Sequence, residues 1–123
     1  MDIILYIMVL QEAIKTKNIN HILTACKKAN GTSSVDYFFY NTLESGPNKG
    51  YVYFLVENNI IVYIGASSNR FRIGQHKKSK NFDEVYYLQC ENYYHWKIET
   101  LLIKNFKTKY NYCNVSKCNY NKS

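Results

Sequence analysis

Five side chains whose chemistry suits phosphodiester hydrolysis follow one another in the second half of the chain. An arginine fork can stabilise the negative charge that grows on phosphoryl oxygens. One glutamate can hold a Mg²⁺ ion, because that ion keeps most of its waters and takes a phosphate oxygen. A histidine, or a tyrosinate formed with help, can accept the proton of the attacking water. The five residues are Tyr53, Tyr63, Arg72, His76 and Glu99.

Each of these residues has a simpler explanation when it is considered alone. A tyrosine in a strand usually packs in the core, and a single arginine is usually a surface cation. His76 alone fits an ordinary polar helix residue, and Glu99 alone fits a solvated helix residue paired with a lysine. The hypothesis of an active site therefore depends on the joint order and spacing of the five.

A β-hairpin is expected to carry the two tyrosines. Residues 51–56 and 60–64 are rich in β-branched and aromatic residues, and the polar residues 57–59 separate them. Two such runs around a short polar turn are typical of a hairpin. Tyr53 and Tyr63 can then share one face of the paired strands.

A helix is expected after the hairpin. Gly65 would close the second strand, and Ser68 or Asn69 would cap a helix that runs to about residue 79. Arg72 and His76 are four residues apart, so they would lie on one face of this helix.

The rest of the chain completes a small α/β unit of α+β type. Residues 84–88 predict a third strand, and residues 91–106 predict a longer helix with Glu99 at the edge of its apolar stripe. The order β-β-α-β-α predicts a small central antiparallel or mixed three-stranded sheet flanked by helices. The apolar positions expected in the last helix are Tyr94, Ile98, Leu101, Leu102 and Phe106.

A helical extension is expected before this unit. Ile3, Ile7, Leu10 and Ile14 recur at helical spacing, and Asn18 can cap a second helix that ends near residues 30–31. Residues 35–40 fit either a strand or a helix. The loop around Pro47 predicts a division into an N-terminal helical extension, 1–46, and a second domain with a basic C-terminal tail, 47–123. The helices offer a possible surface for a homodimer or a larger partner.

The charge of the chain favours a polyanionic partner. Lys and Arg outnumber Asp and Glu by 16 to 9, which gives a formal charge of +7. Binding such a protein to phosphates releases counterions, so a polyanion is the expected partner, although a solvated basic surface has the same composition. The candidate nucleic-acid-binding residues are Arg70, Arg72, Lys77, Lys78 and Lys80.

The cysteines and the N-terminal apolar run favour an intracellular protein, in cytoplasm or nucleus, with no membrane partner. No pair of the four cysteines has C-x-x-C spacing, so reduced thiols are expected rather than a zinc site. The apolar run 3–10 is too short to span a bilayer. The many Asn, Lys, Tyr and Ile residues have AT-rich codons, which indicates an AT-rich viral or bacterial genome.

The order of these residues resembles the GIY-YIG nuclease family. Residues 51–53 read Tyr-Val-Tyr, and residues 63–65, after nine intervening residues, read Tyr-Ile-Gly. These two motifs are similar to the pair that names the family, and the resemblance covers about residues 50–111. Four further positions follow in the family's order: Arg72, His76, Glu99 and Asn111.

The resemblance implies a metal-dependent endonuclease, a hydrolase that cuts DNA with Mg²⁺ or Mn²⁺. It implies that Tyr53 positions the attacking water or the phosphate and that Tyr63 acts as, or supports, the general base. Arg72 would bind the scissile phosphate, and His76 would assist proton transfer or hold a phosphate. Glu99 would be the single metal ligand.

Two positions depart from the family's pattern. Tyr51 replaces the first glycine of the first motif, as in some branches that also read Tyr-Val-Tyr. Ala66 stands where the repair branch carries a lysine, which leaves the general base open and makes His76 a candidate. Asn111 would brace the site by hydrogen bonds, and Gly65 would permit close approach of backbone to substrate.

Three hypotheses remain open on the sequence alone. The first is an active nuclease, and the second is a catalytically inactive module on the same fold that binds nucleic acid. The third is an unrelated small basic protein whose motif match is accidental. Substrate structure, cleavage specificity and oligomeric state are not encoded in any motif of the chain.

Overall fold

A computed structural model describes residues 3–28, 49–68, 76, 79–91 and 94–113. Several sequence predictions fall outside these residues, so they stay predictions. They concern the segment 35–40, the Pro47 loop, most of the helix expected up to residue 79, the C-terminal tail beyond residue 113, and the side chains of Arg70, Arg72, Lys77 and Lys78.

A four-stranded antiparallel sheet confirms the predicted α+β class. The strands lie in the order β1-β4-β2-β3, so β2 and β4 are central and β3 forms one edge. The first strand was not predicted, because two lysines do not have a strand pattern. These two residues form hydrogen-bonded partners of the central part of β4. The strands are β1 (Lys27–Lys28), β2 (Lys49–Glu57), β3 (Ile60–Ser67) and β4 (Glu84–Glu91).

The predicted hairpin forms, with a tight two-residue turn. Asn58 and Asn59 both have positive φ, 52° and 67°, the conformation that matches the right-handed twist of paired strands. The prediction that Gly65 closes the second strand is wrong. The ladder between β2 and β3 continues through Tyr51 opposite Ser67, because Gly65 itself pairs with Tyr53 in mid-ladder.

The part of the chain that the structure describes contains four helical segments beside the sheet. The prediction of a second helix ending near residues 30–31 is wrong, because η1 ends at Ala25 and the chain extends at once into β1. Asn18 does hold the N-cap position of η1, but its side chain makes no capping hydrogen bond. The segments are α1 (Ile3–Thr16), the 3₁₀ helix η1 (Ile19–Ala25), α4 (Tyr94–Asn105) and α5 (Lys109–Cys113).

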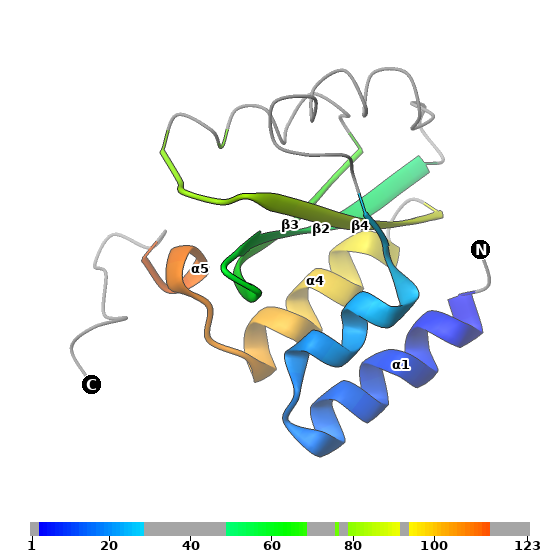
Figure 1. The fold of residues 1–123 in the computed structure, drawn as a ribbon. Helices are drawn as coiled ribbons and strands as arrows, with labels where there is room; N and C mark the ends of the chain where they lie inside the picture. Colours follow the sequence, from blue (N-terminus) through cyan, green and yellow to red (C-terminus); the bar gives the residue numbers. More distant parts are fainter. Residues whose placement is uncertain (1–2, 29–48, 69–75, 77–78, 92–93, 114–123) are drawn as a thin grey trace.

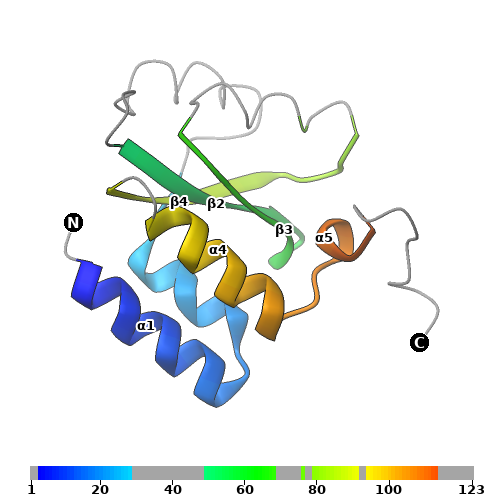
Figure 2. The same ribbon diagram turned by 180° about the vertical axis from the view of Figure 1, so that it is seen from behind.

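The helices α1, η1 and α4 lie against one face of the sheet, and α5 lies beside β3 (Figures 1 and 2). Because side chains alternate along a strand, this face receives Val52 and Phe54 of β2. Leu10 of α1 and Ile22 of η1 join them in one apolar cluster. The N-terminal helices therefore share a core with the sheet.

The opposite face of the sheet carries a second, aromatic cluster. Its buried residues come from all three long strands, and Phe82 and Tyr110 pack against it. Tyr53 and Tyr63 both belong to it, so the prediction that they share a face is confirmed. The buried members are Tyr51, Tyr53, Leu55, Val62, Tyr63, Val85 and Tyr87.

The helix α4 buries a narrower stripe than its sequence suggested. Ile98 and Leu102 are buried on the sheet, whereas Tyr94 and Leu101 are more than two-fifths exposed. One apolar stripe is enough for a helix that covers a sheet with only one side. Among the described residues, no helix is long and apolar enough to cross a bilayer.

Leu102 and Leu101 give a matched test of the register of α4. Leu102 is 0% exposed and Leu101 is 43% exposed. We expect Leu102→Ala to lower the free energy of unfolding by about 2–5 kcal/mol, because it leaves a cavity in the core. Leu101→Ala should change it by less than about 1 kcal/mol. Urea unfolding followed by circular dichroism would measure both, and equal losses would contradict this register.

Candidate active site at the edge strand

A buried hydrogen bond joins a tyrosine to a histidine on the aromatic face of the sheet. The phenol oxygen of Tyr53 lies 2.8 Å from Nε2 of His76, and both side chains are buried. Tyr53 comes from the middle of the central strand β2, so its position is fixed by pairing on both sides. With Nδ1 protonated, His76 would accept the phenol proton at Nε2.

A glycine of the edge strand makes room for this phenol. Gly65 pairs with Tyr53 across the ladder, and the Tyr53 ring lies directly over its Cα. A Cβ atom at Gly65 would lie 2.3 Å from the ring and 2.5 Å from the phenol oxygen. Only glycine leaves this space, so the third residue of the Tyr-Ile-Gly motif sets where the phenol lies.

Tyr63 completes the cluster of rings. Its ring centroid lies 4.7 Å from that of His76 and 6.1 Å from that of Tyr53. The ammonium of Lys80 lies 4.8 Å from the Tyr63 centroid, within the range of a cation–π contact. This contact places one of the predicted nucleic-acid-binding residues beside the predicted catalytic tyrosines.

Asn111 is bound to the backbone of the edge strand. The amide of Ile64 donates to Oδ1 of Asn111 at 2.6 Å, and Nδ2 of Asn111 donates to the carbonyl of Ile64 at 2.7 Å. The hydroxyl of Thr108 also donates to Oδ1. These bonds dock α5 on β3, and they agree with the bracing role expected for this asparagine.

Glu99 approaches the same strand from the helical side of the sheet. It lies on α4, which packs against β3, and its half-buried carboxylate lies near the backbone N–H of Ala66. Burial raises the pKa of this carboxyl above its ordinary value, since the charged form loses water, while the Ala66 hydrogen bond acts in the opposite direction.

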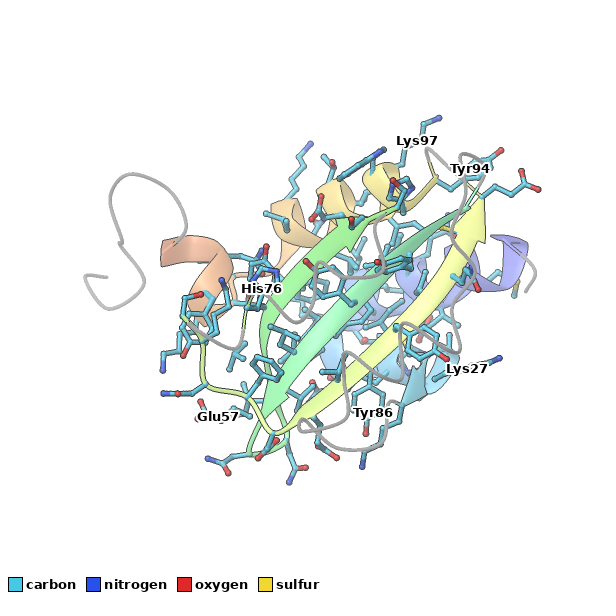
Figure 3. All side chains as sticks on the ribbon, turned by 90° about the horizontal axis from the view of Figure 1, so that it is seen from above. Lys27, Glu57, His76, Tyr86, Tyr94 and Lys97 are labelled. Atoms are coloured by element: carbon cyan, nitrogen blue, oxygen red, sulfur yellow. The ribbon has the colours of Figure 1, made fainter. Side chains whose placement is uncertain are left out.

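The tyrosine pair and the glutamate therefore contact neighbouring residues of β3. The Tyr53 phenol lies over Gly65, and the Glu99 carboxylate lies near the backbone N–H of Ala66, the next residue. Figure 3 shows His76 at the β3 side of the sheet, next to α5, whereas Tyr86 lies toward the opposite edge. The edge strand thus gathers groups that come from both faces.

This donor set fits a single divalent cation rather than a protein-only metal cage. Within the described residues, no three His, Cys, Asp or Glu side chains group together as metal ligands would. Mg²⁺ does not require such a group, because it keeps several waters and needs one or two carboxylates. A cation would also offset the cost of burying the charge of Glu99.

Two residues of the site region, Thr108 and Tyr110, carried no separate prediction. Thr108 is buried at the N-cap of α5 and binds Asn111, three residues later, which is the spacing of a capping pair. The phenol of Tyr110 accepts a hydrogen bond from the backbone amide of Asn81 at 2.9 Å, which ties α5 to the segment after His76. The Thr-x-x-Asn spacing was the available signal.

A second histidine, His95, is buried at the start of α4. Its ring fills the space beside Gly50, where a Cβ would lie 2.2 Å from Nδ1. Among the described residues, neither of its ring nitrogens has a hydrogen-bond partner, and burial lowers its pKa. It is a packing residue, and its burial was not predicted from the sequence.

No protein-family model, curated protein or solved structure matches this chain.

The contact between Gly65 and Tyr53 can be tested through stability. We expect Gly65→Ala to lower the free energy of unfolding by about 1–3 kcal/mol, because the new methyl group overlaps the phenol ring. In a Tyr53→Ala background the same change should cost far less, since the overlapping atoms are gone. Additive losses in the double variant would show that the ring does not lie over Gly65.

The buried charge of Glu99 predicts a pH-dependent stability. In the unfolded chain this carboxyl ionises near 4.5, and in the folded chain its pKa is higher. The destabilisation by the ionised carboxylate is therefore absent below pH 4.5, and it grows as pH rises from there through the pKa of Glu99 in the folded chain. We expect Glu99→Gln to raise the melting temperature at pH 7 in metal-free buffer, but not at pH 4.

A matched control for this measurement is Glu12→Gln, on the exposed side of α1. That substitution should leave the difference in melting temperature between pH 7 and pH 4 the same as in wild-type protein. A Glu99→Gln protein that is less stable than wild type at pH 7 would mean that the carboxylate is stabilised by its surroundings.

Proposed function

We propose that this protein is a metal-dependent endonuclease that hydrolyses phosphodiester bonds in DNA through a GIY-YIG-type site. One observation carries the proposal: the buried Tyr53–His76 pair and the Glu99 carboxylate meet consecutive residues of one edge strand. A proton acceptor and a cation ligand are two groups that attack of water on a phosphate requires.

The tyrosine–histidine pair supplies the proton path of the proposed reaction. Water attacks phosphorus, one new P–O bond forms, and the bond to the leaving oxygen breaks. Tyr53 takes a proton from the attacking water and passes its own to Nε2 of His76, at 2.8 Å. Tyr63 packs on the His76 ring and helps to hold its orientation.

Glu99 is the residue that would hold the divalent cation. Bound there, Mg²⁺ or Mn²⁺ would withdraw charge from the phosphoryl oxygens. The half-buried carboxylate lies near the backbone N–H of Ala66, which favours its charged form and partly offsets the effect of burial on its pKa. The charge of this carboxylate is disfavoured by burial in the absence of a cation, and a bound cation would offset that cost.

Basic residues around the site fit a nucleic-acid substrate. Lys80 lies over the Tyr63 ring, and Lys109 lies over the Tyr110 ring at 5.1 Å, so both lie beside the aromatic cluster that contains Tyr53. Arg72 is expected to bind the scissile phosphate and belongs to the proposal on its sequence position alone. The formal charge of +7 favours a polyanion.

Cleavage of supercoiled plasmid tests the proposal. We expect wild-type protein to nick plasmid with Mg²⁺ or Mn²⁺ and to be inactive in EDTA. Tyr53→Phe should lower the rate by about 10²–10⁴-fold, because it removes the proton relay to His76. Glu99→Gln should abolish detectable cleavage. The matched control is Tyr86→Phe, whose ring lies near Lys28 at the other side of the sheet and should keep full activity.

A metal-binding readout accompanies the cleavage assay. Mn²⁺ should raise the melting temperature of wild-type protein, since a ligand that binds the folded state stabilises it, and should leave Glu99→Gln unchanged. If wild-type protein shifts DNA on a gel but neither cuts it nor responds to Mn²⁺, the chain is instead a catalytically inactive nucleic-acid-binding module.

A further inference from the structure

The helix α4, which carries Glu99, exposes large apolar side chains both before and after Glu99 in the sequence. Trp96 precedes Glu99 by three residues and Ile103 follows it by four, so all three lie on one side of α4. Trp96 is 46% exposed, although burying an indole is strongly favourable. The exposed apolar residues of α4 are Tyr94, Trp96, Leu101 and Ile103.

The charges around this surface are almost all positive. Glu99 is the only acidic residue from position 94 to position 113. Lys97 and Lys104 are exposed on α4 itself, and Lys107 and Lys109 follow it. Figure 3 shows Lys97 projecting outward from α4, away from the sheet. Aromatic side chains among lysines are the pattern that binds single-stranded nucleic acid, since bases stack while phosphates meet cations.

The indole of Trp96 is supported from behind. Its ring packs on the buried ring of His95, with centroids 4.4 Å apart and planes 39° from parallel. His95 in turn packs directly against Gly50 of β2, so its ring has no space to move further into the protein. This support holds the exposed indole in place at little cost in side-chain freedom, as a stacking surface requires.

We propose that Trp96 stacks on an unpaired base next to the phosphate that the Glu99 site cleaves, so that the preferred substrate is DNA with single-stranded bases at the cut. The inference rests on the proposed nuclease function for the position of that phosphate. A base inside a duplex has both faces covered by its neighbours, whereas an unpaired base offers a face to the indole.

Intrinsic fluorescence gives a direct test, because Trp96 is the only tryptophan of the chain. Wild-type protein in EDTA, where no cleavage occurs, would be titrated with a single-stranded oligonucleotide and with a blunt duplex of the same sequence. We expect the single strand to quench the fluorescence and to bind more tightly than the duplex. Quenching by the duplex at equal or lower concentration would contradict the proposal.

Variants separate stacking from general affinity, with fluorescence anisotropy of a labelled single strand as the readout. Trp96→Ala should weaken binding of the single strand roughly 5- to 150-fold, the range for losing one stacked base. Trp96→Phe keeps an aromatic face and should stay near wild type. The control is Ile60→Ala, which removes an even more exposed apolar side chain (63% exposed) at the hairpin turn. Circular dichroism melting would confirm that each variant is folded.

The outcomes distinguish this inference from the proposed function. If Glu99-dependent cleavage is present but Trp96→Ala binds the single strand as wild type does, only the stacking inference fails. If there is neither cleavage nor binding of any DNA, both fail. If Trp96→Ala instead converts a dimer into a monomer, as sedimentation would show, and single-strand affinity is unchanged, the surface joins two copies of the chain.

Discussion

The site depends on one missing side chain. Gly65 lies in the middle of an edge strand, where most residues would place a Cβ atom toward the aromatic face. Because it has none, the Tyr53 ring can lie flat against the strand and bring its phenol to His76. The neighbouring Ala66 offers its backbone to Glu99 from the other face. Two faces of a sheet are thus joined through the backbone of one strand.

The local parts of this arrangement were predictable from the sequence. The hairpin follows from two β-rich runs around a polar turn, and the sharing of one face by Tyr53 and Tyr63 follows from the alternation of side chains. The helical region around Glu99 was also predictable, although its ends shifted to Tyr94 and Asn105. These features need only neighbours in the sequence.

The parts that the sequence did not predict are set by contacts between distant segments. The two lysines of β1 have no strand pattern, and they become a strand only because β4 leaves an open edge beside them. The end of η1 at Ala25 follows from the same pairing. The positions of Lys80 over Tyr63 and of Tyr110 beneath Asn81 depend equally on how segments meet in space. Periodicity carries no information about such meetings.

Two positions of α4 carry side chains that lower local stability. Glu99 carries a charge that its half-buried position disfavours, and Trp96 leaves apolar surface in water. A helix selected only for packing would carry a neutral residue at the first position and a polar one at the second. Conflicts of this kind between local preference and overall fold concentrate at functional sites.

The hydrogen bonds between Asn111 and Ile64 affect whether another copy of the protein can add a strand to this sheet. An edge strand offers unpaired amides and carbonyls that can add a strand from another molecule, a common start of aggregation. The amide of Asn111 occupies both polar groups of Ile64, as a neighbouring strand would. At the other edge, β1 is two lysines long, too short and too charged to recruit a partner strand. The backbone groups of Ile64 are therefore not available to a strand from another molecule.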